Sequence, residues 1–397
     1  MVGADVNENI VRGLQDGKLH IIYEPGLREL VDKALHSGNL LIRNQPEEAD
    51  AFIIAVPTPF YKDKRADLSY VKAAAGSIVP FLCRHNLVIL ESTSPPRTTV
   101  DVLVPILERS GLKAGEDFYL VYSPERVLPG KILEELINNA RVIGGIDKPS
   151  AEAGRELYAT FVKGEIILTN ATTAEMVKLM ENTYRDINIA IANEFSRLAD
   201  RFKIDVWEAI KLANRHPRVR ILEPGPGVGG HCISVDPWFL VEAAPDLARL
   251  TRTAREVNDA QPEFVISLIT RALNGDVAGK RIALLGLTYK ADVDDMRESP
   301  AIVVAHLLQA AGAKIQAFEP SRPGGDFENI PLSSTFEAAL DGVDAVVLLV
   351  GHSIFRQLQP QQIADLSPAR IVIDIVNAWD VETFGRAGFR IMRLGDG

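Results

Sequence analysis

The sequence predicts an α/β protein with two parallel-sheet regions joined by a long helix, and two observations predict this. Short apolar runs, continuous rather than alternating, are separated by amphipathic stretches in both halves of the chain. Such runs are typical of strands that are buried on both faces of a parallel sheet. Between the halves, residues 172–203 contain no glycine or proline, and roughly thirty residues without a breaker favour one continuous helix.

Composition excludes several classes of protein. The 397 residues are 47% hydrophobic and 24% charged, which is typical of a globular chain rather than a disordered or fibrous one. The net charge of −10 argues against binding to nucleic acid or to a membrane surface. Two cysteines cannot build a disulfide framework or a zinc cage, so we expect a cytoplasmic protein. The opening MVGADVNENI predicts no secretory signal, and every apolar run is too short to span a bilayer.

Three strands are expected in the first half, at residues 51–56, 87–90 and 119–122, with an amphipathic helix at 71–82. A polar segment follows each strand and brings Thr58, Thr93 and Glu125 to the strand ends. Ligands of parallel sheets bind at the carboxyl ends of the strands. We therefore expect these three side chains to share one edge of the first sheet.

The middle and the second half continue the pattern. Helices are expected at 172–203, 206–214 and 247–272, with a glycine- and proline-rich loop at 223–230. Strand–helix alternation restarts after Gly275, with strands at 281–285, 314–318, 345–350 and 371–375 and a helix at 300–311. The predicted domains are residues 1–167, a helical domain at 168–273, and residues 274–397.

Cys232 is the first candidate for chemistry. The preceding Gly229 and Gly230 allow a backbone to approach a ligand closely, and the carboxylate of Asp236 follows four residues later. These features favour a nucleophile, and the alternative is a small buried hydrophobic residue. Cys83 lacks both features, and we expect it only to pack.

Lys178 and Asn182 are four residues apart in the long predicted helix and therefore share a face. An ammonium and an amide presented together could stabilise a developing oxyanion. The spacing alone favours the alternative, a solvated face on which Glu175 and Lys178 form a weak ion pair.

Other polar residues at strand ends have two interpretations each. Glu125 is a general base or a helix N-cap, and Thr93 orients a water molecule or caps the next helix. Asp5 binds a ribose or caps the helix that follows it. Gly286 and Lys290 follow a strand and could hold a phosphate, although one glycine turn is a weak signal. No histidine or carboxylate spacing predicts a metal site.

Six segments in the same order resemble the UDP-glucose/GDP-mannose dehydrogenase family, from Asp5 almost to the C-terminus. These are Val56–Pro59, Glu91–Thr93, Ser123–Arg126, Ala174–Asn182, Gly229–Pro237, and Gly286–Lys290 continuing to Arg297–Pro300. Further segments resemble the branch that oxidises N-acetylated hexosamine nucleotides: Asn214–Val219, Pro224–Cys232 and Val235–Phe239.

The resemblance implies two Rossmann-like domains and an NAD-dependent, four-electron oxidation of a UDP-sugar at C6. The implied substrate is UDP-N-acetyl-D-mannosamine, with UDP-N-acetylglucosamine as the alternative. Cys232 would carry the thiohemiacetal and the thioester, and Lys178 and Asn182 would stabilise the oxyanion. Asp236 and Thr93 would position or activate water, and Glu125 would be the general base for thioester hydrolysis.

The resemblance also implies the binding residues. Those for NAD are Asp5, Val56, Pro57, Thr58 and Thr93. Those for the UDP-sugar are Glu125, Arg126, Lys178, Asn182, Arg218, Gly229, Gly230 and Lys290. Arg218 resembles an arginine that family members contribute from a neighbouring subunit, which implies a homodimer or a higher homo-oligomer built around helix 172–203.

The N-terminus departs from the family pattern. Family members place a strand and a glycine-rich turn before the equivalent of Asp5, which here is the fifth residue. A fingerprint glycine turn normally lies about 20 residues before such an acidic residue. We therefore expect the N-terminal sheet to lack its first strand and its pyrophosphate-binding turn. The protein is then either longer than this chain or a non-catalytic relative that binds UDP-sugars.

Overall fold

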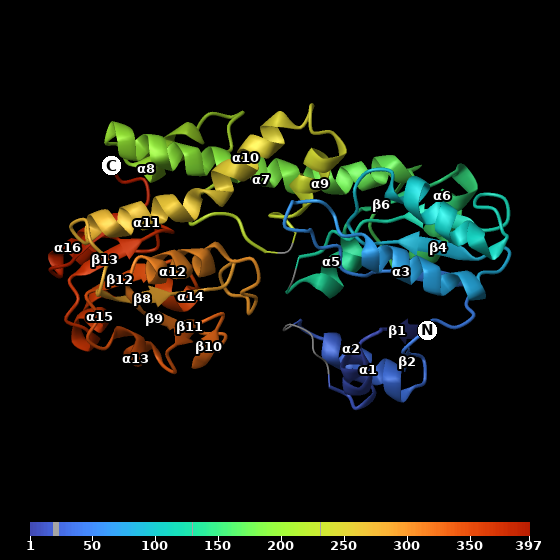
Figure 1. Ribbon diagram of the computed structural model, residues 1–397, viewed down its shortest axis with the longest axis horizontal. Helices are drawn as coiled ribbons and strands as arrows, with labels where there is room; N and C mark the ends of the chain where they lie inside the picture. Colours follow the sequence, from blue (N-terminus) through green and yellow to red (C-terminus); the bar gives the residue numbers. More distant parts are fainter. Residues whose placement is uncertain (19–23, 129, 231) are drawn as a thin grey trace. The chain divides into compact units, whose positions relative to one another are not determined.

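The computed structural model describes residues 1–18, 24–128, 130–230 and 232–397 (Figure 1). Its contacts divide the chain into two compact units. The first unit contains Met1–Glu181 and Trp238–Pro245, and the second contains Asn182–Pro237 and Asp246–Gly397. The chain crosses from one unit to the other three times: inside the helices α7 and α9, whose bounds are given below, and after Pro245.

A five-stranded sheet forms the centre of the first unit, in the order β3-β4-β5-β6-β7. Strands β3, β4 and β5 are parallel, and Ile54, Leu90 and Tyr122 lie in register at their carboxyl ends. Strand β6 runs antiparallel to β5, and β7 runs parallel to β6. The strand bounds are Ala51–Ile54 for β3, Leu87–Leu90 for β4, Tyr119–Tyr122 for β5, Arg141–Gly145 for β6 and Ile166–Asn170 for β7.

The three predicted strands of this half are confirmed and are parallel to one another, whereas β6 and β7 were not predicted. The chain reverses after β5, so β6 and β7 begin at the edge where β3, β4 and β5 end. Helices and turns cover the sheet: α3 Ser69–Ile78, η1 Val79–Phe81, the π-helix η2 Thr98–Leu103, α4 Val104–Leu107, η3 Glu108–Ser110, α5 Ile132–Asn138 and α6 Lys148–Tyr158. Apolar side chains that these elements bury form the core, including Val71, Leu90, Leu103 and Leu120.

The first residues form a separate small sheet. Strand β1 (Val2–Ala4) pairs in parallel with β2 (Leu41–Arg43), and helices α1 (Glu8–Gln15) and α2 (Leu27–His36) lie between them in the sequence. Among the described residues, this sheet shares no strand pairing with the five-stranded sheet, in which β3 is an edge strand.

A seven-stranded sheet forms the centre of the second unit, in the order β10-β11-β9-β8-β12-β13-β14, and only β10 is antiparallel to its neighbour. The strands are β8 Arg281–Leu285, β9 Lys314–Phe318, β10 Gly325–Phe327, β11 Ile330–Leu332, β12 Ala345–Leu348, β13 Ile371–Asp374 and β14 Arg390–Arg393. The helices beside it are α12 Pro300–Ala310, α13 Phe336–Leu340, α14 Ser353–Arg356, α15 Pro360–Leu366 and α16 Val381–Arg386. The four predicted strands are confirmed, and β10, β11 and β14 are additional.

The long predicted helix is confirmed as α7, Ala171–Phe202, with 32 residues. Helices α8 (Val206–Ala213) and α9 (Asp236–Ala243) follow it. The expectation of one helix at 247–272 is wrong, because the chain forms α10 (Arg249–Asp259) and α11 (Gln261–Ala272) on either side of Ala260. Pro262 is the physical reason, since it has no N–H to continue α10 and fits the first turn of a new helix. Within the described residues, no helix combines the length and apolar character that crossing a membrane requires.

Candidate functional site

The first group of site residues lies at the carboxyl ends of β3, β4 and β5, as predicted. One hydroxyl ties two of these ends together. Ser92 Oγ accepts a hydrogen bond from Val56 N at 2.9 Å and donates to Val56 O at 2.7 Å. This double contact fixes the loop that continues to Pro57 and Thr58 against the loop that carries the half-buried Thr93.

Glu125 follows β5 and does not cap a helix. Its Oε1 accepts hydrogen bonds from the backbone N–H groups of Arg126 at 2.5 Å and Val127 at 2.9 Å. The next helix, α5, has Lys131 at its N-cap position, so the capping alternative for Glu125 is wrong. Thr93 does not cap a helix either, because Arg97 precedes η2.

Two residues of α7 hold the loop that carries Glu125. Lys178 Nζ donates to the backbone oxygen of Glu125 at 2.7 Å. Arg126 pairs with Glu181 at 2.5 Å and also donates to the backbone oxygen of Ala140. The guanidinium of Arg126, an expected substrate ligand, is therefore bound to α7 in this structure.

The alternative of a solvated Glu175–Lys178 ion pair is wrong. Glu175 is fully buried and accepts hydrogen bonds from Arg97 N at 2.5 Å and Thr99 N at 2.7 Å. It thereby fixes the start of the π-helix that follows Thr93. Burial raises the pKa of Glu175, although its hydrogen bonds from Thr99 and Arg97 oppose that effect.

A buried charged cluster beside Glu125 was not predicted. Arg141 Nη2 lies 2.8 Å from Glu91 Oε1 and 3.6 Å from Glu125 Oε2, and Tyr158 OH donates to Glu91 Oε1 at 2.5 Å. Burial raises the pKa of Glu91 and the pKa of Tyr158. An arginine at the start of an otherwise apolar strand is the signal that could have identified this cluster.

The second group of site residues belongs to the second unit. Asn182 Nδ2 donates to Asp236 Oδ2 at 2.5 Å, and both side chains are buried. The backbone N–H of Asp236 donates to the backbone oxygen of Cys232 at 2.8 Å, so these two residues occupy one turn at the start of α9. Cys232 is partly exposed, as is required of a nucleophile, whereas Cys83 is an exposed surface residue rather than the packed one we expected.

Two glycines allow the Cys232 loop to pack closely on the second sheet's loops. A Cβ atom on Gly229 would lie 2.4 Å from the backbone oxygen of Glu298, and one on Gly230 would lie 2.9 Å from the ring of Tyr289. Gly230 also has a φ of +84°, which disfavours other residues. The glycines are therefore required for a close backbone approach. His231, inside this motif, lies outside the described residues.

Two backbone amides of the loop after β8 already bind a buried carboxylate. The N–H groups of Leu287 and Thr288 both donate to Glu319 Oε2, which is buried at the carboxyl end of β9. Glu319 also contacts His352 Nε2 at 3.2 Å. These two amides are therefore already bound, while Lys290, the other residue expected to hold a phosphate with Gly286, is exposed.

The remaining expected ligands lie on the surface. Asp5 directly follows β1 and is half-buried, and its Oδ1 accepts a hydrogen bond from Asn7 N at 2.7 Å. Asn7 is the N-cap of α1, so the capping alternative for Asp5 is wrong. Arg218 lies exposed in the loop after α8.

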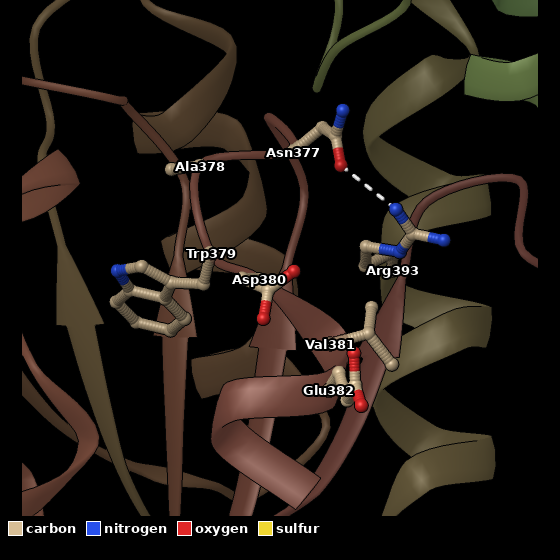
Figure 2. A pocket seen from close by; sticks show the side chains of 7 residues that line it. All are labelled: Asn377, Ala378, Trp379, Asp380, Val381, Glu382 and Arg393. Atoms are coloured by element: carbon tan, nitrogen blue, oxygen red, sulfur yellow. Dashed lines mark hydrogen bonds between the residues drawn. The ribbon is translucent and has the colours of Figure 1, made fainter.

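A pocket in the second unit lies away from these residues, where β13 and β14 end (Figure 2). Several of its polar side chains already have partners in the fold. Arg393 donates to Asn377 Oδ1 at 2.9 Å and pairs with Asp205 at 2.7 Å, while Asp380 caps α16. In the part of the chain that the structure describes, no three or more acidic, histidine or cysteine side chains gather as a metal site would require.

Family models match nearly the whole chain. The NAD binding domain of the UDP-glucose/GDP-mannose dehydrogenase family matches residues 1–162, its central domain matches residues 172–260, and its UDP binding domain matches residues 283–381.

Individual relatives agree with this assignment. The UDP-N-acetyl-D-mannosamine dehydrogenase of Methanococcus maripaludis is 46% identical over all of this chain and 92% of its own length. An NDP-N-acetyl-D-galactosaminuronic acid dehydrogenase of Ralstonia solanacearum is 47% identical over 96% of this chain and 91% of its own. The solved UDP-D-ManNAc dehydrogenase of Pyrococcus horikoshii matches all of this chain and 93% of its own, with 39% identity and a TM-score of 0.92. The chain therefore belongs to the UDP-glucose/GDP-mannose dehydrogenase family and is an NAD-dependent dehydrogenase of nucleotide sugars.

Proposed function

We propose that this enzyme oxidises the C6 alcohol of UDP-N-acetyl-D-mannosamine to the carboxylate, and that each substrate molecule reduces two molecules of NAD⁺. The observation that carries the proposal is the turn in which Cys232 precedes an Asp236 carboxylate bound to Asn182 at 2.5 Å. The names of several relatives that cover this chain support the choice of sugar.

The chemistry requires a covalent intermediate on the protein. Loss of a hydride and a proton converts the alcohol to an aldehyde, and the thiol of Cys232 adds to its carbonyl carbon to form a thiohemiacetal. Loss of a second hydride and a proton gives a thioester, and water releases the carboxylic acid and restores the thiol. A thiol suits this sequence because the adduct retains the aldehyde until it is oxidised again. NAD⁺ supplies the hydride acceptor for both oxidations.

Polar residues around these steps have distinct roles. We assign Lys178 and Asn182 to the oxyanion of the tetrahedral intermediates, because an ammonium and an amide donate hydrogen bonds to developing negative charge. Asp236 and Thr93 position or activate water. Glu125 accepts the proton of the water that attacks the thioester, and its partly exposed carboxylate suits a general base.

Residues at the ends of three strands could bind parts of a nicotinamide dinucleotide, including a ribose. Asp5 stands at the carboxyl end of the parallel strand β1, where an acidic side chain accepts ribose hydroxyl protons. Val56, Pro57, Thr58 and Thr93 lie where β3 and β4 end and would line the same cofactor. For the UDP-sugar we assign Arg126, Arg218, Gly229, Gly230 and Lys290.

We also propose that two copies of the chain form a dimer. Helix α7 carries an apolar stripe at intervals of three or four residues, and its most exposed members are Met180, Tyr184 and Phe202, at 55%, 67% and 69%. The other members are Met176, Ile187, Ile191, Phe195 and Leu198. A stripe of this length along one helix fits the same stripe of a two-fold related copy. Light scattering should give a dimer, and Tyr184→Lys should shift it toward monomer.

The deciding experiment measures NADH and uronate from a limiting amount of UDP-N-acetyl-D-mannosamine. Two NADH per sugar, with uronate as the product, is the expected result. Cys232→Ser should abolish uronate formation, and Cys83→Ser is the matched control. The gluco and galacto epimers are compared by kcat/KM, and a higher value for either would replace the proposed sugar. UDP-sugar binding without NADH from any epimer would identify a non-catalytic relative.

A further inference from the structure

Arg141 is a buried cation that contacts two carboxylates at one edge of the five-stranded sheet. Its side chain is 7% exposed, and its Nη2 lies 2.8 Å from Glu91 and 3.6 Å from Glu125. Its Nε donates to Ser123 Oγ at 3.0 Å, and its guanidinium carbon lies 4.1 Å from the centre of the Tyr158 ring. The guanidinium is therefore held from three sides.

The reversal of strand direction after β5 explains why this arginine faces Glu125. Strands β5 and β6 are antiparallel, and Val121 pairs with Gly145 and Tyr122 with Gly144. Continuing this register by three residues places Glu125 opposite Arg141. A sheet with β6 parallel to β5 would place Arg141 at the opposite edge, away from the loop that carries Glu125.

The two oxygens of Glu125 have different partners. Oε1 accepts the backbone N–H groups of Arg126 and Val127, whereas Oε2 faces Arg141. Among the described residues, the other nearby cations bind elsewhere. Lys178 contacts the backbone oxygen of Glu125, and Arg126 pairs with Glu181. Arg141 is therefore the cation that acts on the carboxylate itself.

Glu91 competes with Glu125 for that cation. Its Oε1 receives both Arg141 Nη2 and the hydroxyl of Tyr158, at 2.8 and 2.5 Å. The hydrogen bond from Tyr158 stabilises part of the negative charge on Glu91. It therefore weakens the attraction between Glu91 and the guanidinium of Arg141. The burial of Glu91 and Tyr158 strengthens these contacts relative to water.

We infer that Arg141 is a positioning residue for the general base Glu125, and that the Glu91–Tyr158 pair sets how strongly Arg141 acts on it. The inference deepens the proposed function and rests on it. Without Arg141, Oε2 of Glu125 would lose its charged partner while Oε1 kept its two amides. Thioester hydrolysis is the step that depends on Glu125, so this step should respond, whereas the two hydride transfers should not.

Two variants should change, in opposite directions, how Arg141 is shared between Glu91 and Glu125. Tyr158→Phe removes a donor from Glu91, which then draws Arg141 away from Glu125. Glu91→Gln removes the competing charge and leaves Arg141 to Glu125. We expect the acidic limb of the pH profile of hydrolysis to move to higher pH in the first variant and to lower pH in the second.

The experiment follows single turnovers between pH 5 and 9 and records NADH and uronate separately. Hydrolysis is the appearance of uronate after both NADH molecules have formed. Arg141→Lys keeps the charge but not the planar fork, so hydrolysis should slow roughly tenfold at unchanged KM. Arg155→Lys, in the exposed pair with Glu152 on α6, is the matched control. Melting temperatures and NAD⁺ affinities test whether each variant is folded.

The possible results distinguish a positioning role of Arg141 from a purely structural role. Opposite shifts of the hydrolysis limb, with an unchanged pH profile for NADH formation, would support the inference. Lower melting temperatures without any shift would show a merely structural cluster and overturn it, as would uronate that keeps pace with NADH in both variants at every pH. A wild-type protein that forms no NADH would instead overturn the proposed function, and this inference with it.

Discussion

In the five-stranded sheet Glu125 follows a buried strand and its side chain is 39% exposed. In the seven-stranded sheet Glu319 follows β9 and Asp374 is the last residue of β13, and both are fully buried. Glu319 accepts hydrogen bonds from the backbone N–H groups of Leu287, Thr288 and Ser321 and contacts His352. Asp374 accepts those of Val376, Ala378 and Trp379.

This difference shows that a carboxylate at a strand end has two uses. In the second sheet it lies beneath the loops and satisfies their amides, so the loops are fixed and present other side chains, such as Lys290. In the first sheet Oε1 of Glu125 accepts two amides, Oε2 faces Arg141, and the side chain stays partly exposed. Exposure and the direction of the side chain, rather than its place in the sequence, therefore distinguish Glu319 and Asp374, which support loops, from Glu125, for which we propose a catalytic role. Four predictions test this comparison.

Glu125→Gln should have the largest effect, because an amide cannot accept the proton of the attacking water. We expect thioester hydrolysis to slow by on the order of 10²- to 10⁴-fold, with little change in melting temperature. Uronate release after a single turnover measures this. The exposed Glu134→Gln on α5 is the control, and hydrolysis within twofold of wild type would remove Glu125 from the mechanism.

Asp374→Ala should act on stability instead. It leaves three backbone N–H groups without their acceptor in a buried turn, which costs roughly 3 kcal/mol of unfolding free energy. Urea denaturation measures the loss, while activity per folded molecule should stay near that of wild type. The surface residue Asp365 provides a matched Asp→Ala control. An inactive but equally stable variant would contradict the proposed division between the two sheets.

Glu319→Gln should reveal a pH-dependent contribution of this carboxylate to the free energy of unfolding. Burial raises the pKa of Glu319, but its hydrogen bonds from His352 and from the loop amides outweigh burial and hold that pKa below its usual value. The ionised carboxylate therefore stabilises the fold above the unfolded pKa, about 4.5, and this stabilisation is lost as the pH falls through the folded value. The difference in unfolding free energy between Glu319→Gln and wild type should be largest near pH 7 and shrink toward pH 4. A difference independent of pH would contradict the assignment.

Substitutions of Asp5 and Asn7, near the N-terminus, should give the smallest effects. They should distinguish a residue that binds a ligand from one that supports the local backbone. Asn7→Ala removes the N-cap of α1 and should cost about 1 kcal/mol of stability. Asp5→Asn keeps the contact with Asn7 but removes the charge, so the KM for NAD⁺ should rise roughly tenfold without a loss of stability. Melting curves and NAD⁺ titrations of both variants test this, and an unchanged KM in Asp5→Asn would mean that Asp5 supports only the turn.

Much of the fold could be predicted because its signals are local. The strands ending at Leu90, Tyr122 and Phe318, and the uninterrupted α7, follow from apolar runs and from the absence of glycine and proline. The break at Ala260 was missed although Pro262 signals it. Strand β6 was not predicted, and its antiparallel direction depends on the path of the chain after β5, which apolar content does not encode.

The sequence by itself determined the family and supplied Cys232 and the polar residues that we propose for the reaction, because these depend on residue identity and spacing along the chain. Only the tertiary structure decided which polar groups are already bound. It places Glu175 beneath the Thr93 loop and Glu319 beneath the Gly286 turn, and it brings Arg141 to Glu125. These contacts join residues far apart in the sequence, and their partners are chosen by packing and by the need to pair every buried charge.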